Sequence, residues 1–168
     1  MLELQRSGTH QRASTGQIVS RVILGTRERC TRMRYAKTGS IRVILVDDHS
    51  AFREGLRSLL GSYTDIEVVG EAENGEEVVH AMPYICPSAI VMDINMPKLN
   101  GIDATRTIKA HYPHVVIVGL SVHADNVYQT AMVDAGATSV VSKGMAGLFL
   151  YREIKAGIEH SPPVPNAA

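Results

Sequence analysis

The chain has 168 residues, of which 45% are apolar and 20% are charged, with equal numbers of acidic and basic side chains. This composition is typical of a soluble globular protein with one ordinary domain and some additional length. It excludes a membrane-spanning protein, because no apolar run approaches the ~20 residues that a membrane helix needs, and no apolar block of a signal peptide follows Met1. We therefore expect a cytoplasmic location.

The charge is unevenly distributed along the chain. Residues 1–40 hold eight Lys or Arg against two Glu, a net charge of +6, and residues 41–168 carry a net charge of −6. Residues 1–40 show no sustained period, so we predict a basic leader that is disordered or partly helical, with a helix at Gln17–Arg29 in the second case. The clustered Arg could instead form a nucleic-acid arm, and translation could start at Met33.

From Ile41 onward, short apolar runs alternate with helical patterns. The runs predict strands at Ile41–Val46, Ile66–Gly70, Ala89–Met92, Val115–Leu120 and Ser139–Val141. The helical patterns lie at about 50–61, 75–82, 102–111, 124–134 and 145–159. Apolar strands separated by helices indicate parallel strands covered on both faces, so we predict a doubly wound α/β domain over residues 41–160. A flexible Pro-rich tail is expected at 161–168.

Local residues predict where several helices begin and end. Asn74 is suited to cap the second helix, with Glu77 three residues later as in a capping box. Asn100–Gly101 is expected to turn the chain before the third helix, and Gly136 follows the fourth helix as a C-terminal glycine.

Four of the five predicted strands end in a polar or charged residue. These residues are Asp47 and Asp48 after the first strand, Asp93 after the third, Ser121 after the fourth and Lys143 after the fifth. The second strand, which ends near Glu71, is the exception. Because the carboxyl ends of parallel strands form one ligand-binding edge, we expect these side chains to meet there.

The residue types at this edge point to phosphoryl chemistry. Three crowded carboxylates would raise one another's pKa unless a cation lay among them, and a hard divalent ion such as Mg²⁺ suits carboxylate oxygens. Lys143 and Ser121 are suited to hold phosphoryl oxygens. A carboxylate can itself be the nucleophile. We select Asp93, because it ends the central third strand, whereas Asp47 and Asp48 form a pair suited to the metal.

Four segments carry a resemblance to a known family: VDD (Val46–Asp48), MDINMPKLNG (Met92–Gly101), LS (Leu120–Ser121) and SKG (Ser142–Gly144). In order and spacing they resemble the receiver domain of bacterial two-component response regulators, over about Ile41–Glu159. The resemblance implies a flavodoxin-like, five-stranded parallel sheet in the order 2-1-3-4-5 with five helices.

The resemblance also implies a role for each site residue. Asp93 would accept a phosphoryl group from a histidine kinase or histidine phosphotransfer protein, Lys143 would bind a phosphate oxygen, and Ser121 would be the switch hydroxyl. The Mg²⁺ ligands would be Asp47, Asp48, Asp93 and the backbone carbonyl of Asn95. Such a receiver is not a conventional enzyme: it catalyses its own phosphorylation and slow autodephosphorylation.

The sequence shows no output domain, so we expect the protein to act by docking a downstream protein partner, by forming a homodimer or by passing its phosphate onward, and DNA binding is not expected. Apolar area for that output would come from Val127, Met132 and Val140, unless these residues lie in the core. Val140 stands where the family usually has an aromatic residue that couples the switch hydroxyl to partners, so this coupling is expected to be weak or differently routed.

The segment VDDHSAFREGLRSLL resembles the sequences of the subfamily in which a DNA-binding helix-turn-helix domain follows the receiver. Only nine residues follow Glu159, so we expect a stand-alone receiver or a truncated relative of a transcription factor. His49 is expected to have a structural or surface role, while His123 and Asn95 are expected to tune the lifetime of the phosphoryl group.

Two further classes of function remain open. One is a DNA-binding regulator that acts through the basic leader. The second is a metal-dependent phosphatase with an aspartyl nucleophile, but such enzymes usually have a second carboxylate two residues after the nucleophile, where this chain has Asn95.

Overall fold

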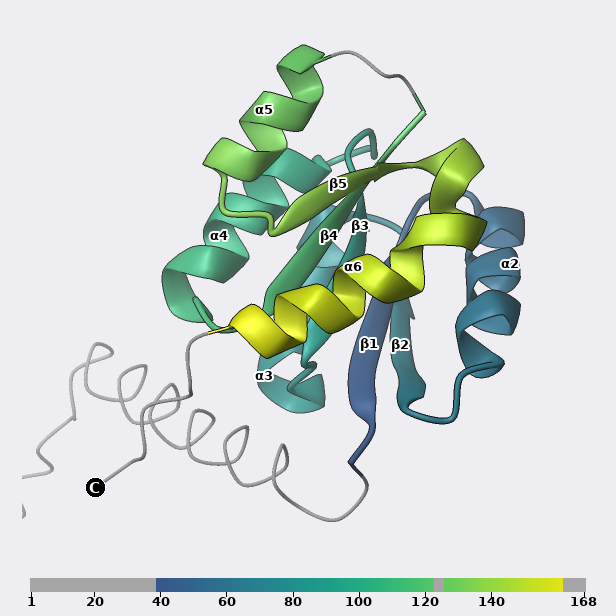
Figure 1. The fold of residues 1–168 in the computed structure, drawn as a ribbon. Helices are drawn as coiled ribbons and strands as arrows, with labels where there is room; N and C mark the ends of the chain where they lie inside the picture. Colours follow the sequence, from purple (N-terminus) through teal and green to yellow (C-terminus); the bar gives the residue numbers. More distant parts are fainter. Residues whose placement is uncertain (1–38, 123–125, 162–168) are drawn as a thin grey trace, which may run out of the picture.

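The computed structural model describes residues 39–122 and 126–161. Within them, five parallel strands form one sheet in the order β2-β1-β3-β4-β5 (Figure 1). The strands are β1 (Ile41–Val46), β2 (Ile66–Ala72), β3 (Ala89–Asp93), β4 (Val116–Ser121) and β5 (Ser139–Ser142). The helices are α2 (Ser50–Gly61), α3 (Gly75–Ile85), α4 (Gly101–His111), α5 (Asn126–Asp134) and α6 (Ala146–His160), with a 3₁₀ turn at Lys143–Met145. The predicted flavodoxin-like fold is confirmed.

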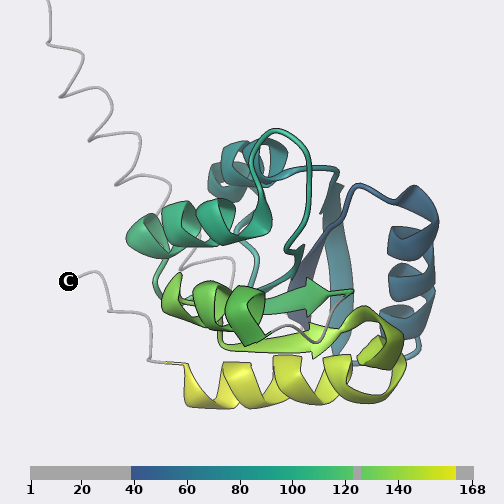
Figure 2. The same cartoon turned by 90° about the horizontal axis from the view of Figure 1, so that it is seen from above.

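Helices cover the sheet on both faces (Figure 2). Successive side chains of a strand point to opposite faces, and β1 shows this clearly. Val43 and Leu45 belong to the apolar cluster that packs under α2 and α6, whereas Ile44 and Val46 belong to the cluster under α3, α4 and α5. Since both faces of β1 are buried, the unbroken apolar run before Asp47 is explained.

Most element boundaries differ from the predicted ones by only a few residues. β2 continues past Gly70 to Ala72, so Glu71 lies within the strand rather than after it. α3 continues past the predicted end at 82 to Ile85 and includes Pro83. A proline in a helix interior forgoes one backbone hydrogen bond. The helix nevertheless closes its last turn, since the Cys86 N–H donates to the Met82 carbonyl at 3.2 Å.

The predicted helix ends are confirmed. The Asn74 side chain accepts a hydrogen bond from the Glu77 N–H at 3.1 Å, and the Glu77 carboxylate accepts one from the Glu73 N–H at 2.9 Å. The Asn100 side chain accepts a hydrogen bond from the Asp103 N–H at 2.9 Å and begins α4. Gly136 has a φ of 106° just after α5, in the region that favours glycine.

Several predictions lie outside the described residues. These are the basic leader through residue 38, the possible helix at Gln17–Arg29, the role of His123 and the tail after Ser161. In the part of the chain that the structure describes, none of the helices has the length and apolar character needed to cross a membrane.

Candidate functional site

Carboxylates from two neighbouring strands meet at the carboxyl edge of the sheet. Val46 at the end of β1 is paired with Met92 of β3, so the residues that follow them in the chain, Asp47 and Asp93, lie side by side. One ligand atom each from Asp47, Asp48, His49 and Asp93 lies within 4.8 Å of the others. Asp47 is 0% and Asp93 2% exposed, whereas Asp48 is exposed. The predicted clustering of the three carboxylates is therefore observed.

Lys143 is the cation that compensates this cluster in the described structure. It follows β5 directly, and its Nζ lies 2.6 Å from Asp47 Oδ2 and 2.9 Å from Asp93 Oδ2. The ring of Phe52 on α2 lies 4.9 Å from the same Nζ, close enough for a cation–π contact. The ammonium group is thus held between two carboxylates and one aromatic ring.

Burial and neighbouring charge act against each other on the pKa values of this cluster. Burial raises the pKa of the Asp93 carboxyl and the nearby Asp47 raises it further, and these effects outweigh the hydrogen bond from Lys143. For Lys143, burial lowers the pKa, but the two carboxylates more than offset this and the pKa is raised. Lys143 therefore stays protonated at neutral pH.

Ser121 and Asn95 also lie at this edge. Ser121 is buried at the end of β4 and is paired in register with Ser142, the residue before Lys143. Asn95 is exposed, and its backbone N–H points to Asp93 Oδ1 at 3.4 Å. The structure therefore brings every residue predicted for the site to one edge of the sheet.

Gly101, the first residue of α4, packs closely against the backbone of Asp93. Its N–H donates to the Ile94 carbonyl at 3.0 Å. A Cβ at this position would overlap the backbone carbonyl oxygen of Asp93. The sequence predicts Gly101 as part of a turn, but the structure shows that the close approach of α4 to the end of β3 also requires a residue without a side chain.

Two residues near the acids were not predicted as part of the site. The ring Nδ1 of His49 lies 2.9 Å from Asp48 Oδ1 and 3.3 Å from Asp47 Oδ1, so this side chain lies among the carboxylates. Arg53 on α2 is only 7% exposed, and its Nη1 donates to the Asp47 carbonyl oxygen at 2.5 Å. Its spacing from Leu56 and Leu60, the remaining buried residues of α2, is the pattern that could have revealed it.

A doubly wound parallel sheet with clustered carboxylates and a lysine at its carboxyl edge defines the receiver class of signalling domain. Residues 43–155 match the response regulator receiver domain family. The chain belongs to this family. Receiver domains take part in phosphorylation-dependent signalling with histidine kinases or phosphotransfer proteins, and they bind Mg²⁺ at an acidic pocket.

Individual relatives agree with this assignment. The transcriptional regulatory protein DegU of Brevibacillus brevis is 39% identical over 115 residues, which are 68% of this chain and 49% of the relative. The chain thus spans about half the length of the curated relatives it matches. The response regulator domain of Thermotoga maritima CheB has a TM-score of 0.68 at 28% identity, with 73% of this chain and 99% of that chain covered. A LuxR-family response regulator from Aurantimonas sp. SI85-9A1 has a TM-score of 0.68 at 30% identity, with 74% and 92% covered.

Replacement of Lys143 by Met tests whether this lysine compensates the buried carboxylates. In metal-free buffer at pH 7, Lys143→Met should lower the free energy of unfolding by roughly 3 kcal/mol, because two buried carboxylates lose their cation. The loss should shrink at pH 5, because removal of Lys143 raises the pKa of Asp93 further, and the destabilisation from a raised carboxyl pKa accumulates as the pH rises from the usual pKa to the raised one. Urea unfolding at both pH values measures this.

Lys155→Met is the matched control, because Lys155 forms an ion pair with Asp65 at 2.7 Å that is about one third exposed, whereas Asp47 and Asp93 are almost fully buried. Its loss should be much smaller. Equal losses for Lys143→Met at pH 5 and pH 7, or a loss no larger than that of Lys155→Met, would contradict the compensating role.

Proposed function

We propose that this protein is a phosphorylation-dependent switch of a two-component phosphorelay, in which Asp93 accepts a phosphoryl group from a histidine kinase or a histidine phosphotransfer protein. The observation that carries the proposal is the position of the Asp93 carboxylate. It ends the central strand β3, next to Asp47 and 2.9 Å from the Lys143 ammonium group. A carboxylate oxygen of Asp93 forms a bond to phosphorus as the phosphorus–nitrogen bond of the donor breaks.

The donor set at this edge fits a hard divalent cation. The carboxylates of Asp47, Asp48 and Asp93 supply oxygen ligands within one small group, and Mg²⁺ prefers such oxygens. We assign the backbone carbonyl of Asn95 as a further ligand. When bound, Mg²⁺ neutralises the carboxylates and the charge that develops on the phosphoryl oxygens.

Lys143 and Ser121 recognise the transferred group. In the described structure Lys143 pairs with Asp93 Oδ2 and Asp47 Oδ2. Once Asp93 is phosphorylated, the ammonium group donates to a phosphoryl oxygen, because the new group brings about two negative charges to the same place. The hydroxyl of Ser121 donates to a second oxygen. Response regulators are usually cytoplasmic, and the same location for this protein would allow contact with a histidine kinase.

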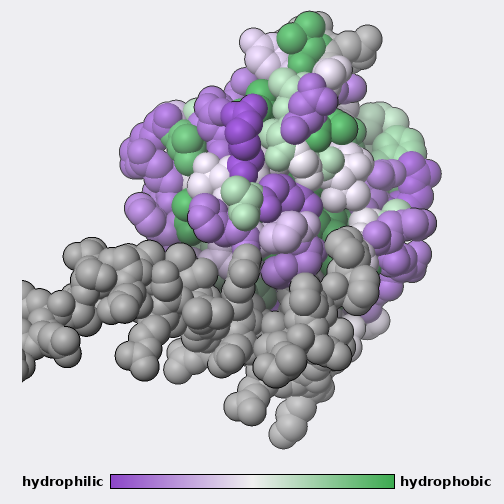
Figure 3. All heavy atoms as spheres, turned by 90° about the vertical axis from the view of Figure 1, so that its left-hand side faces the viewer, coloured by the Kyte–Doolittle hydropathy of each residue, from purple (hydrophilic) through white to green (hydrophobic). Residues whose placement is uncertain are grey.

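The output of the switch lies on the face formed by α5, β5 and α6. Val127 of α5 is 77% exposed, and Val133, Met145 and Leu148 are exposed as well. In Figure 3, apolar atoms lie at the top of the molecule, where Figure 1 places α5, among hydrophilic ones. Met132 is fully buried, so it belongs to the core rather than to this surface.

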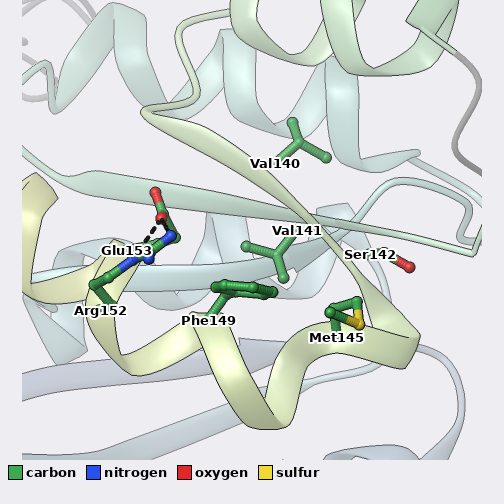
Figure 4. Close-up of a pocket in the computed structure, with 7 residues that line it drawn as sticks. All are labelled: Val140, Val141, Ser142, Met145, Phe149, Arg152 and Glu153. Atoms are coloured by element: carbon green, nitrogen blue, oxygen red, sulfur yellow. Dashed lines mark hydrogen bonds and ion pairs between the residues drawn. The ribbon is translucent and has the colours of Figure 1, made fainter.

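A shallow pocket of about 360 Å³ lies on this face between β5 and α6, and its lining includes Ser142, the residue before Lys143 (Figure 4). It is lined by Val140, Val141, Ser142, Met145, Phe149, Arg152 and Glu153. Ser142 precedes Lys143, so a movement of the lysine changes the lining directly. Val140 lines this pocket at the position where the receiver family usually has a larger aromatic residue. We infer that this pocket carries the change of state to a protein partner or a second copy.

Transcriptional regulation is the second candidate function. It is favoured by the 39% identity to a relative named as a transcriptional regulatory protein. In this case the same phosphorylation of Asp93 would control a gene-regulatory output.

Phosphorylation of Asp93 is tested by incubating the protein with acetyl phosphate and Mg²⁺ and measuring the intact mass. The wild type should gain one phosphoryl group, and Asp93→Asn should gain none because the nucleophile is lost. Asp103→Asn, which alters an exposed carboxylate on α4, should be phosphorylated like the wild type. The proposal would be wrong if the wild type stayed unmodified or if Asp93→Asn carried the phosphoryl group.

The switch role of Ser121 is tested by amide hydrogen exchange. Ser121→Ala should still be phosphorylated, but the change in exchange that phosphorylation causes in β5 and α6 should be lost, because the hydroxyl no longer follows the phosphoryl group. The wild type with and without phosphorylation supplies the reference change. If Ser121→Ala shows the same change as the wild type, Ser121 is not the switch residue.

A further inference from the structure

Arg53 makes hydrogen bonds in three directions from a nearly buried position on α2. Its Nη1 donates to the Asp47 carbonyl at 2.5 Å, its Nε donates to Glu71 Oε2 at 3.0 Å, and its Nη2 donates to Glu73 Oε1 at 3.3 Å. Burial lowers the pKa of Arg53, but the two glutamates raise it by more, so the guanidinium is a stable cation. A nearly buried cation with three hydrogen-bonded partners is expected to hold those partners in fixed positions.

The carbonyl that Arg53 contacts belongs to the peptide joining Asp47 to Asp48. The pairing of β1 with β2 ends at Val46 and Ala72, and the Asp47 N–H makes one more bond to the Ala72 carbonyl at 3.2 Å. Beyond this point the chain leaves the sheet. Arg53 therefore holds the first peptide that the sheet itself no longer holds, and this peptide orients both adjacent carboxylates.

We propose that Arg53 is a positioning residue for the divalent-cation site, which it serves by fixing the Asp47–Asp48 peptide while Glu71 and Glu73 fix its own guanidinium. This inference rests on the proposed binding of Mg²⁺ by these carboxylates. A lysine cannot replace Arg53, because a single ammonium group cannot direct donors to three separate acceptors as the planar guanidinium does. Arg53 thus connects the end of β2 to the metal site.

The charge of Arg53 and its positioning role predict opposite effects on Mg²⁺ affinity when Arg53 is removed. A cation beside an acidic site repels Mg²⁺, so its removal should strengthen Mg²⁺ binding if only its charge matters. If Arg53 acts by positioning the peptide, its removal should weaken Mg²⁺ binding despite the loss of repulsion. The direction of the change therefore separates the two roles.

Arg57 offers a matched control on the same helix. It contacts Glu71 Oε1 through Nε at 2.7 Å and Nη2 at 2.5 Å, whereas Arg53 contacts the other carboxylate oxygen of Glu71. Among the hydrogen bonds and ion pairs of the described residues, none joins Arg57 to Asp47. Arg57→Gln removes the same charge and disturbs the same glutamate, but it leaves the Asp47–Asp48 peptide held.

The test is the dissociation constant for Mg²⁺, measured by isothermal titration calorimetry on the full chain for the wild type, Arg53→Gln, Arg53→Lys and Arg57→Gln. Both Arg53 variants should bind Mg²⁺ roughly tenfold more weakly, the size seen when residues supporting metal ligands are replaced. Arg57→Gln should bind as tightly as the wild type or slightly more tightly. Arg53→Lys keeps the charge and provides the answer if Arg53→Gln does not fold.

Wild-type or tighter Mg²⁺ affinity in the folded Arg53 variants would overturn the inference, as would an equal loss in Arg57→Gln. These outcomes leave the proposed function intact. A wild-type protein that binds no Mg²⁺ would instead remove the proposed metal site and this inference with it.

Discussion

The structure around the candidate site depends on one electrostatic constraint, which is that two buried carboxylates and a third beside them need a cation. Asp47 and Asp93 are almost completely excluded from water, and in the described structure the Lys143 ammonium group lies within 3 Å of both. The three residues come from the chain just after β1, from the end of β3 and from the turn after β5. The parallel sheet, covered on both faces, is what brings segments so distant in the chain to one edge.

Individual residues position the backbone around this cluster of carboxylates. Gly101 lets the start of α4 approach the Asp93 backbone, and Arg53 holds the peptide between Asp47 and Asp48. Ser142 connects Lys143 to the pocket beside Phe149. In the proposed function, a change of charge at Asp93 reaches the outer face through the turn that carries Lys143. Short connections of this kind suit a switch, since a local charge change needs only a small movement to reach a partner surface.

The sequence predicts the doubly wound fold class and the polar residues at the strand ends because both depend on local patterns, whereas the strand order and the residue roles come from the resemblance to receiver domains. Apolar strands covered on both faces read as unbroken runs, and the acids and the lysine stand directly at their ends. Arg53 is not predicted, because an arginine in a helix usually faces water, and only its acceptors at the end of β2 explain its burial. The contacts of His49 with Asp47 and Asp48 depend on how the chain turns into α2, which residue type alone does not determine. The same limit applies to Met132, whose apolar character suits a core and a surface equally.

The most direct test of the electrostatic constraint is the pKa of the Asp93 carboxyl, measured by carbon-13 NMR titration without and with saturating Mg²⁺. Without the metal the pKa should lie above its usual value of 3.8, because burial and the neighbouring Asp47 outweigh Lys143. Saturating Mg²⁺ should lower this pKa, since a divalent cation stabilises the ionised carboxylate. A pKa at or below 3.8 in the metal-free protein, or one that Mg²⁺ leaves unchanged, would contradict the view that Lys143 alone leaves these carboxylates in need of a further cation.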